Sequence, residues 1–418
     1  MSANDLILPV TALAVFGVIV RPFRVPEYVF AVLGAAALVG AGAIPWRGAV
    51  DAAAKGADVY LFLGGMMLLA EIARQEGLFN WLAAHAVRHA AGSAKRLFLI
   101  VYGVGTLVTV FLSNDATAVV LTPAVYAAAV AARAQPLPYL LICAFVANAA
   151  SFVLPISNPA NLVIFEGRMP PLPSWLYYFG LPSIAAIVAT YVLLWWTQRA
   201  ALRQPIAQDC DLRPLPFGGR CAAIGILVTA VALMAASAMD MKLGLPTFIA
   251  GVSVTVLVLL VAKLSPLPVL RGVSWGILPL VAGLFILVEG VERTGVLAGL
   301  ADLLRGAVAG DPREAAAVSG VAVAVAANLI NNLPTGVIAA TLGQEAGVPV
   351  QVAAGMLIGV DLGPNLSVTG SLATILWLTA LRREGEAVTA WQFLKLGVVI
   401  MPPALLLALA AMFALPAP

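Results

Sequence analysis

Charged residues are scarce in this sequence. Asp, Glu, Lys and Arg make up 10% of the 418 residues, whereas a soluble domain carries about 25%. The chain cannot cover its surface with charge, and 62% of its residues are hydrophobic. Apolar runs long enough to span a bilayer recur along the whole length, so lipid is the expected solvent for most of the surface. The sequence therefore predicts an all-helical, polytopic membrane protein.

Other absences exclude several classes of function. The three cysteines, Cys143, Cys210 and Cys221, have neither a metal-ligand spacing nor a CxxC pattern. No basic tract resembles a nucleic-acid-binding patch, and no nucleotide-binding loop is present. The acidic pairs and His-rich sites of membrane enzymes that act on lipids are missing as well. We therefore expect no metal, no cofactor, no nucleic-acid partner and no enzymatic activity. Energy must come from an ion gradient or from a separate subunit, such as a soluble ATPase.

The two halves of the chain are related in sequence. Gly65, Glu71 and Gly77 recur as Gly283, Glu289 and Gly295, each 218 residues later, and the same offset places Asn114 on Asn332 and Thr117 on Thr335. Such internal repeats are typical of secondary transporters. The longest polar stretch, 198–220, separates them. We predict a first repeat over 1–197, a cytoplasmic linker over 198–220 and a second repeat over 221–418.

The positions of Lys and Arg predict the orientation of the repeats. If 97–132 and 314–344 are re-entrant hairpins, ten helices cross the membrane, five in each half. With the N-terminus outside, all but seven of the 23 basic residues are then cytoplasmic, as expected for an inner membrane. The seven are Arg47, Lys55, Arg168, Lys242, Arg293, Arg305 and Arg313. An odd number of crossings per half makes the second repeat inverted.

Polar breaks interrupt four of the apolar runs, and we predict a binding site where they meet. Unwound backbone at membrane depth occurs where protein or a wet cavity satisfies its polar groups. Two breaks come from each half, which is how alternating-access sites are built. The alternative is that Ser, Thr and Asn side chains join neighbouring helices. The candidate residues are Ser113, Asn114, Asp115 and Thr117; Asn148, Asn158 and Asn161; Asn332 and Thr335; and Asp361, Gly370 and Ser371.

Acidic residues in these runs are candidates for proton coupling. Asp115 and Asp361 lie in the first and fourth breaks. A carboxylate at membrane depth costs several kcal/mol, and desolvation disfavours its charged form, so we expect it to bind and release protons. A helix-capping role is the alternative. The repeat-related Glu71 and Glu289 lie close to an interface, where a structural or pivot role is favoured over proton transfer.

Several of these elements resemble one family. The runs Ser113–Pro123 (SNDATAVVLTP), Asn331–Thr335 (NNLPT) and Asp361–Trp377 (DLGPNLSVTGSLATILW) resemble conserved elements of the arsenite permease family of ArsB type, within the ion transporter superfamily. Leu154–Leu162 is also similar to a family element. The likeness covers essentially the whole chain. One departure is Asn365, at a position where family members often have Lys.

The resemblance implies export of arsenite and antimonite in exchange for protons. Its matching positions imply substrate binding by Asn114, Thr117, Asn158, Asn161, Asn332, Thr335, Gly370 and Ser371, and proton coupling by Asp115 and Asp361. From the polar breaks and the repeat, we add Ser113, Asn148, Glu71 and Glu289 as candidate accessory residues. The breaks contain no Arg or Lys, which argues against an anionic substrate. A sodium/proton antiporter of NhaD type would fit the buried acids and broken helices equally well.

Overall fold

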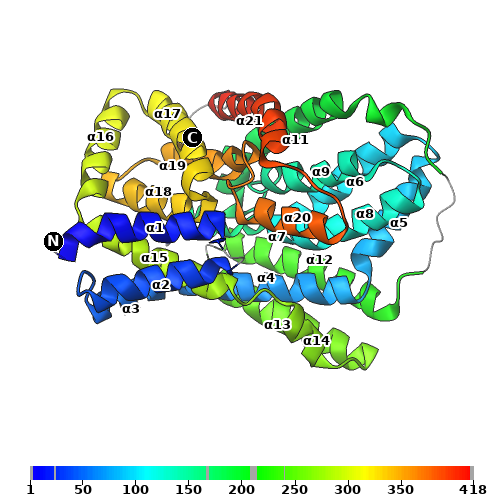
Figure 1. Cartoon of the computed structure of the whole chain (residues 1–418), viewed down its shortest axis with the longest axis horizontal. Coiled ribbons are helices and arrows are strands. Elements are labelled where there is room, and N and C mark those ends of the chain that lie inside the picture. The colour runs from blue at the N-terminus through cyan, green and yellow to red at the C-terminus, as the bar shows by residue number, and fades with distance from the viewer. Residues whose placement is uncertain (1–2, 23–24, 166–168, 208–213, 240, 415–418) are drawn as a thin grey trace.

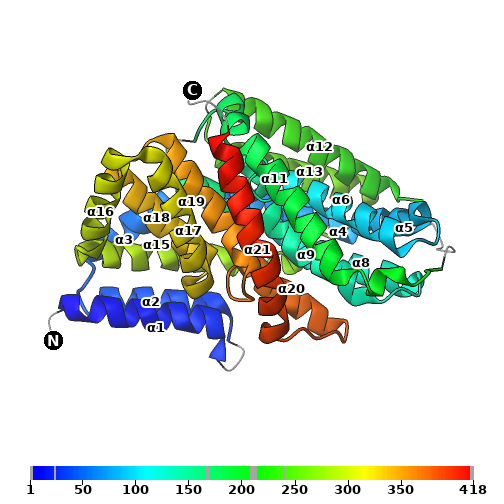
Figure 2. The same cartoon turned by 90° about the horizontal axis from the view of Figure 1, so that it is seen from above.

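The structure is a computed structural model that describes residues 3–22, 25–165, 169–207, 214–239 and 241–414. Within these ranges every regular element is a helix, which confirms the predicted fold class. Arg168, Cys210 and the middle of the predicted linker, 208–213, lie outside the described residues. Figures 1 and 2 show the chain from two perpendicular directions.

The first half contains two apolar helices, a short helix, a long helix and then the two interrupted runs. Its helices are α1 (Ile7–Val20), α2 (Glu27–Gly40), α3 (Trp46–Lys55), α4 (Ala57–Gln75), α5 (Leu78–Ala90), α6 (Ala94–Phe111), α7 (Asn114–Ala116), α8 (Thr122–Ala131), α9 (Pro136–Ala149), α10 (Pro159–Ile164) and α11 (Leu172–Gln198). A π-helical segment, Thr117–Leu121, joins α7 to α8.

The second half repeats this order. Its helices are α12 (Phe217–Ala238), α13 (Gly244–Ala262), α14 (Pro266–Gly272), α15 (Ile277–Arg293), α16 (Val296–Gly310), α17 (Pro312–Ile330), α18 (Asn332–Ala346), α19 (Val350–Leu362), α20 (Leu372–Arg383) and α21 (Ala390–Phe413). The packing is reciprocal, because α2 packs on α15 as α13 packs on α4, while α11 packs on α21. This arrangement suits two related halves; the inversion of the second half stays a prediction.

The described helices include eight that are long and apolar enough to cross a membrane, or nine if the bent pair α3 and α4 counts as one span. Each arm of the first hairpin, Ala94–Phe111 and Asn114–Ala131, is counted among the eight. The apolar helices α1, α2 and α9 have 14 residues each and are too short for this count. The chain is thus a multi-pass membrane protein, and the number of ten crossings stays a prediction.

The run 94–131 folds back on itself as a hairpin. Ser113 begins the return arm, and its hydroxyl accepts a hydrogen bond from Ala116 N at 3.2 Å. Both ends of the hairpin are tied to one segment of the linker: Ile206 N donates to Gly92 O at 3.2 Å, and Ala207 N donates to Ala132 O at 2.7 Å. The hairpin therefore begins and ends at the same side of the molecule, and its re-entrant character stays a prediction, because each arm is long enough to cross the membrane.

The helices form two groups. The support helices, α1–α4 and α12–α15, pack on one another through the pairs α2–α15 and α4–α13. The core helices, α6–α10 and α17–α20, contain both hairpins and both broken helices and pack mainly within their own group. Figure 1 shows α1, α2, α4 and α13 along one side of the molecule and α9, α19 and α21 along the other.

The close crossing of α17 and α19 gives a stability prediction. A Cβ atom on Gly359 would overlap the backbone carbonyl oxygen of Gly320. Gly359→Ala should therefore destabilise the protein by about 1–3 kcal/mol and lower its unfolding temperature in detergent. Gly299→Ala on α16 is the matched control, because nothing lies within 4 Å of its new methyl group. Equal unfolding temperatures for the two variants would contradict this packing.

Candidate functional site

The second and fourth breaks meet at Asp361, near the end of α19. Its side chain is buried, with 1% of the residue exposed. Oδ2 accepts a hydrogen bond from Ser151 Oγ at 2.7 Å, and Oδ1 accepts one from Asn158 Nδ2 at 2.8 Å. Asn158 also caps α10, because its Oδ1 accepts from Ala160 N at 3.0 Å. Ser151 and Asn158, which precede Asp361 by 210 and 203 residues in the sequence, thus contact it directly.

Asp361 has only neutral partners among the described residues. Ser151 Oγ lies 2.7 Å from Asp361 Oδ2 and 2.8 Å from the carbonyl oxygen of Asn148. A hydroxyl has one proton to donate. Both contacts are full hydrogen bonds only when Asp361 is protonated and donates to Ser151, which in turn donates to Asn148. The geometry therefore accommodates a proton on Asp361 without rearrangement.

Amide side chains join the two halves beside this carboxyl group. Asn148 Nδ2 donates to Asn365 Oδ1 at 3.0 Å, and Asn365 Nδ2 donates to Phe145 O at 3.0 Å. Asn328, on α17, holds the fourth break by donating to Gly363 O at 2.8 Å and accepting from Ser367 Oγ at 2.7 Å. The sequence interpretation included Asn148 but assigned no bond to Asn365 and omitted Asn328.

The second hairpin turns at Asn331 and reaches the fourth break. Asn331 has φ 75°, and its side chain donates to Thr369 O at 3.2 Å. Asn332 N donates to Gly370 O at 2.9 Å, while Thr335 Oγ1 donates to Asn331 O at 2.7 Å. A Cβ on Gly370 would lie 2.5 Å from Pro364 Cα, so this position needs glycine for close packing.

Capping accounts for part of the polar side chains. Ser371 Oγ accepts from Thr374 N at 3.1 Å and caps α20. Asn161 Nδ2 lies within hydrogen-bond distance of three carbonyl oxygens of the second break, those of Ser151, Leu154 and Pro155, at 2.9 to 3.3 Å. These two predicted substrate-binding residues therefore also hold the unwound backbone in place.

Three amide oxygens in this region are buried without a hydrogen-bond partner. They are Asn148 Oδ1, Asn161 Oδ1 and Asn332 Oδ1. The orientations of Asn148 and Asn161 are fixed by the acceptors that face their amino groups. A buried acceptor without a donor is costly, by about 1–3 kcal/mol. Each of these oxygens is therefore available to a donor that the described residues do not supply, such as a water molecule or a bound solute.

The tip of the first hairpin is joined to the second break. Ser157 Oγ donates to Val110 O at 3.0 Å. Within the tip, Thr117 Oγ1 lies 2.8 Å from Thr109 Oγ1, and Asn114 Oδ1 accepts from Asp115 N at 2.9 Å. The π-helical turn that follows displaces the normal hydrogen bonds of α8, a feature frequent at functional sites.

Asp115 lies apart from Asp361 and faces the support helices. It lines a small hollow of about 60 Å³ together with Ser113, Pro159 and Glu71. Glu71 is buried and accepts from Arg74 Nε at 2.7 Å and from Gln75 Nε2 at 2.7 Å. Its carboxylate packs so tightly on Gly272 that a Cβ there would overlap it. Glu71 is thus paired at one end of the small hollow, outside the cluster around Asp361.

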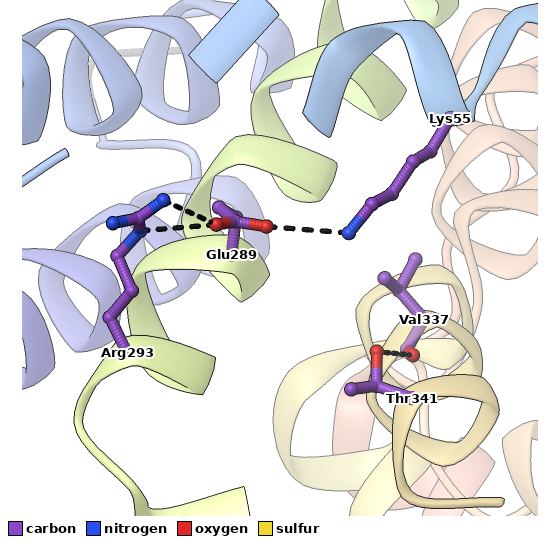
Figure 3. Close-up of polar contacts among 5 residues, drawn as sticks. All are labelled: Lys55, Glu289, Arg293, Val337 and Thr341. Atoms are coloured by element: carbon purple, nitrogen blue, oxygen red, sulfur yellow. Dashed lines mark hydrogen bonds and ion pairs between the residues drawn. The ribbon is translucent and has the colours of Figure 1, made fainter. Parts of the chain in front are cut away.

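Glu289, the repeat mate of Glu71, lies at a much larger opening. The large cavity has a volume of about 890 Å³, and its lining includes Lys55, Glu289, Glu292 and Glu345. Glu289 accepts from Arg293 Nη2 at 2.8 Å and from Lys55 Nζ at 3.3 Å (Figure 3).

The large cavity and the small hollow lie on opposite sides of one contact between support and core helices. On α4, Val59 lines the large cavity and Phe62 lines the small hollow. On α10, Leu162 lines the large cavity and Pro159 lines the small hollow. Three residues of helix rise by about 4.5 Å, so roughly one turn separates the two spaces. Phe62 is fully buried in this barrier.

The chain is similar to known membrane transporters. A family model described as citrate transporter matches residues 12–359. The arsenical pump membrane protein of Escherichia coli is 28% identical over 367 residues, covering 83% of this chain and 84% of that protein. An uncharacterized transporter of Mycobacterium tuberculosis is 24% identical over 426 residues, covering 97% of each. The solved structure of the Alcanivorax borkumensis YdaH transporter shares the fold, with TM-score 0.58 and 16% identity, covering 88% of this chain and 86% of that one.

Proposed function

The chain belongs to the citrate transporter family, so it is a multi-pass membrane transporter rather than an enzyme, and we propose that it exports arsenite and antimonite across the inner membrane in exchange for protons. The arsenical pump membrane proteins among its relatives support this substrate class. The observation that carries the proposal is the neutral polar cluster around Asp361, which has unpartnered amide oxygens and no basic side chain among its described partners.

The substrate assignment follows from hydrogen-bond chemistry. Near neutral pH, arsenite is mostly an uncharged trihydroxide with three O–H donors. Those donors complement the unpartnered oxygens of Asn148, Asn161 and Asn332. A dicarboxylate or phosphate would instead need cationic partners such as an Arg clamp, and the four breaks contain no Lys or Arg.

Proton coupling is assigned to Asp361, with Asp115 as the second candidate. A proton on Asp361 completes the hydrogen-bond chain through Ser151, whereas a deprotonated carboxylate offers the substrate two acceptor oxygens. Proton and substrate then compete for the same carboxyl group of Asp361. Each proton that enters down a membrane potential of 100 mV supplies about 2.3 kcal/mol, enough for roughly a fifty-fold gradient of a neutral solute.

In the proposed alternating-access cycle, the large cavity and the small hollow open in turn on either side of the helix contact around Phe62. The orientation that we predict from the Lys and Arg distribution puts the large cavity, which Lys55 and Lys242 line, on the outer side of the membrane. This structure is then the outward-open state, with the path toward the cytoplasm closed around Phe62 and the small hollow. In the opposite state, the core helices shift against the support helices, so that the small hollow opens and the large cavity closes.

The test uses inside-out vesicles that contain the wild-type protein and have an acid lumen. We expect arsenite uptake that depends on the proton gradient, together with alkalinisation of the lumen. Added sodium should leave the gradient unchanged. If sodium collapses the gradient and arsenite is not taken up, the protein is a sodium/proton antiporter. Vesicles without the protein provide the control for leakage.

If a soluble ATPase is the energy source, uptake will need added ATP and cytosol but no proton gradient.

A further inference from the structure

Two helix faces form opposite walls of the large cavity. On α15 the lining residues are Phe285, Val288, Glu289 and Glu292, and on α18 they are Val337, Ala340, Thr341, Gln344 and Glu345. Residues three and four apart lie on one face of a helix. Because α15 is a support helix and α18 is a core helix, the cavity is a gap between the two groups. Figure 3 shows Val337 and Thr341 of α18 beside the bridge between Lys55 and Glu289.

The charges along this gap are unevenly paired. Glu289 is shared by two cations, Arg293 at 2.8 Å and Lys55 at 3.3 Å. On the opposite wall, Glu345 Oε2 is buried and has no hydrogen-bond partner. Glu292 is close enough to interact electrostatically with Lys55, Glu289 and Glu345, which places these groups in one cluster. Glu289 is therefore paired with two cations, whereas Glu345 on the opposite wall has a carboxylate oxygen that lacks a partner.

Lys55 is held by fewer contacts than the other cation that pairs with Glu289. Its side chain is 50% exposed and makes one contact to Glu289, at 3.3 Å. Arg293, by contrast, reaches the same carboxylate through both Nε at 3.0 Å and Nη2 at 2.8 Å. An exposed single-contact pair contributes little to stability, and a lysine ammonium sits on a flexible four-carbon stem. Glu289 would therefore keep a counter-charge if Lys55 left.

We propose that Lys55 is a gate residue that changes partners during transport, binding Glu289 while the large cavity is open and Glu345 when α18 closes on α3. The exchange moves the ammonium from a carboxylate that has a second cation to one that has an unpartnered oxygen. It gives the closed state an ion pair between a support helix and a core helix. The inference rests on the proposed alternation of access but does not depend on which solute is carried.

The first test is cross-linking, which needs no substrate. Lys55→Cys and Glu345→Cys are combined in a chain whose three natural cysteines are replaced by Ala, and the protein in membranes is treated with a reducible bifunctional thiol reagent. The reagent must be as long as a Lys–Glu ion pair, because such a pair holds its Cα atoms farther apart than the roughly 7 Å that a disulfide spans. We expect the 55–345 cross-link to accumulate with time and to block solute uptake until a reductant is added. The matched pair, Lys55→Cys with Glu289→Cys, lies on the support helices and should cross-link without dependence on the transport cycle.

The second test exchanges the charges. Lys55→Glu should slow uptake by about tenfold, because it places another carboxylate in an acidic cluster. Adding Glu345→Lys should restore most of the rate, whereas adding Glu289→Lys should not. The proposal is overturned if the 55–345 cross-link never forms while the 55–289 cross-link does, or if Glu289→Lys restores the rate as well as Glu345→Lys. Because cross-linking is measured on gels, its outcome stands even if the solute proves to be sodium rather than arsenite.

Discussion

Asp361→Asn should abolish proton-driven accumulation of arsenite in inside-out vesicles. The amide has the shape of a protonated carboxyl group, so Asn158 can still donate to its oxygen and its amino group can donate to Ser151. The variant should therefore fold normally but be unable to release a proton. Accumulation should fall from roughly fifty-fold per proton at 100 mV to equilibration, and any remaining flux should be independent of lumenal pH.

The control for this prediction is a carboxylate outside the site. Asp302→Asn removes an acid whose side chain is 69% exposed on α16, and accumulation should stay at the wild-type level. Thermal unfolding of each variant in detergent separates loss of coupling from loss of folding. If Asp361→Asn accumulates arsenite as the wild type does and Asp115→Asn does not, the coupling proton is carried by the residue in the small hollow, and the assignment to Asp361 is wrong.

Asn365→Lys should uncouple transport by a different route. Asn365 is one turn from Asp361 and is fully buried among amide and carbonyl groups. A lysine there needs an anionic partner, and Asp361 is the carboxylate at that spacing. The ion pair would hold Asp361 in its charged form, so proton-driven accumulation should be lost while the protein still folds. Uptake assays and thermal unfolding on the same preparations measure the two effects.

The double variant provides the decisive comparison. In an Asp361→Asn background, the lysine introduced by Asn365→Lys has no countercharge, and a buried unpaired charge of this kind costs about 3–5 kcal/mol. We therefore expect the double variant to be much less stable than either single variant. If the two effects on stability are merely additive, the introduced lysine does not pair with Asp361, and the uncoupling has another cause.

The sequence predicted the four breaks because their signals are local. Ser113, Asn158, Asn331 and Ser371 each precede a helix and cap it through the side chain. Such residues start helices in any context, and they stand out within apolar runs. The same helix-capping signals predicted where the two hairpins lie. The predicted ranges, 97–132 and 314–344, agree within a few residues with the helical arms over 94–131 and 312–346.

Contacts between distant segments could not be predicted in this way. Asn328 is a single amide in an alanine-rich run, and its bonds to Gly363 and Ser367 depend on where α19 crosses α17. The repeat-related Glu71 and Glu289 have different surroundings because the large cavity is open and the small hollow is nearly closed. Under the proposed alternation of access, that difference belongs to one state of the transport cycle, and a repeat in the sequence contains no information about it.

The contacts of Asp361 have a consequence for biosynthesis. Ser151 and Asn158 donate to the carboxyl group of Asp361, which lies 210 and 203 residues later in the chain. Asn148 donates to Asn365, and 217 residues separate these two. While the ribosome is still making the second half, these polar side chains of the first half have no such partners in the lipid, where unpaired polar groups cost several kcal/mol each. The first half alone is therefore an incomplete product, and membrane quality control should recognise a truncated chain as unfolded.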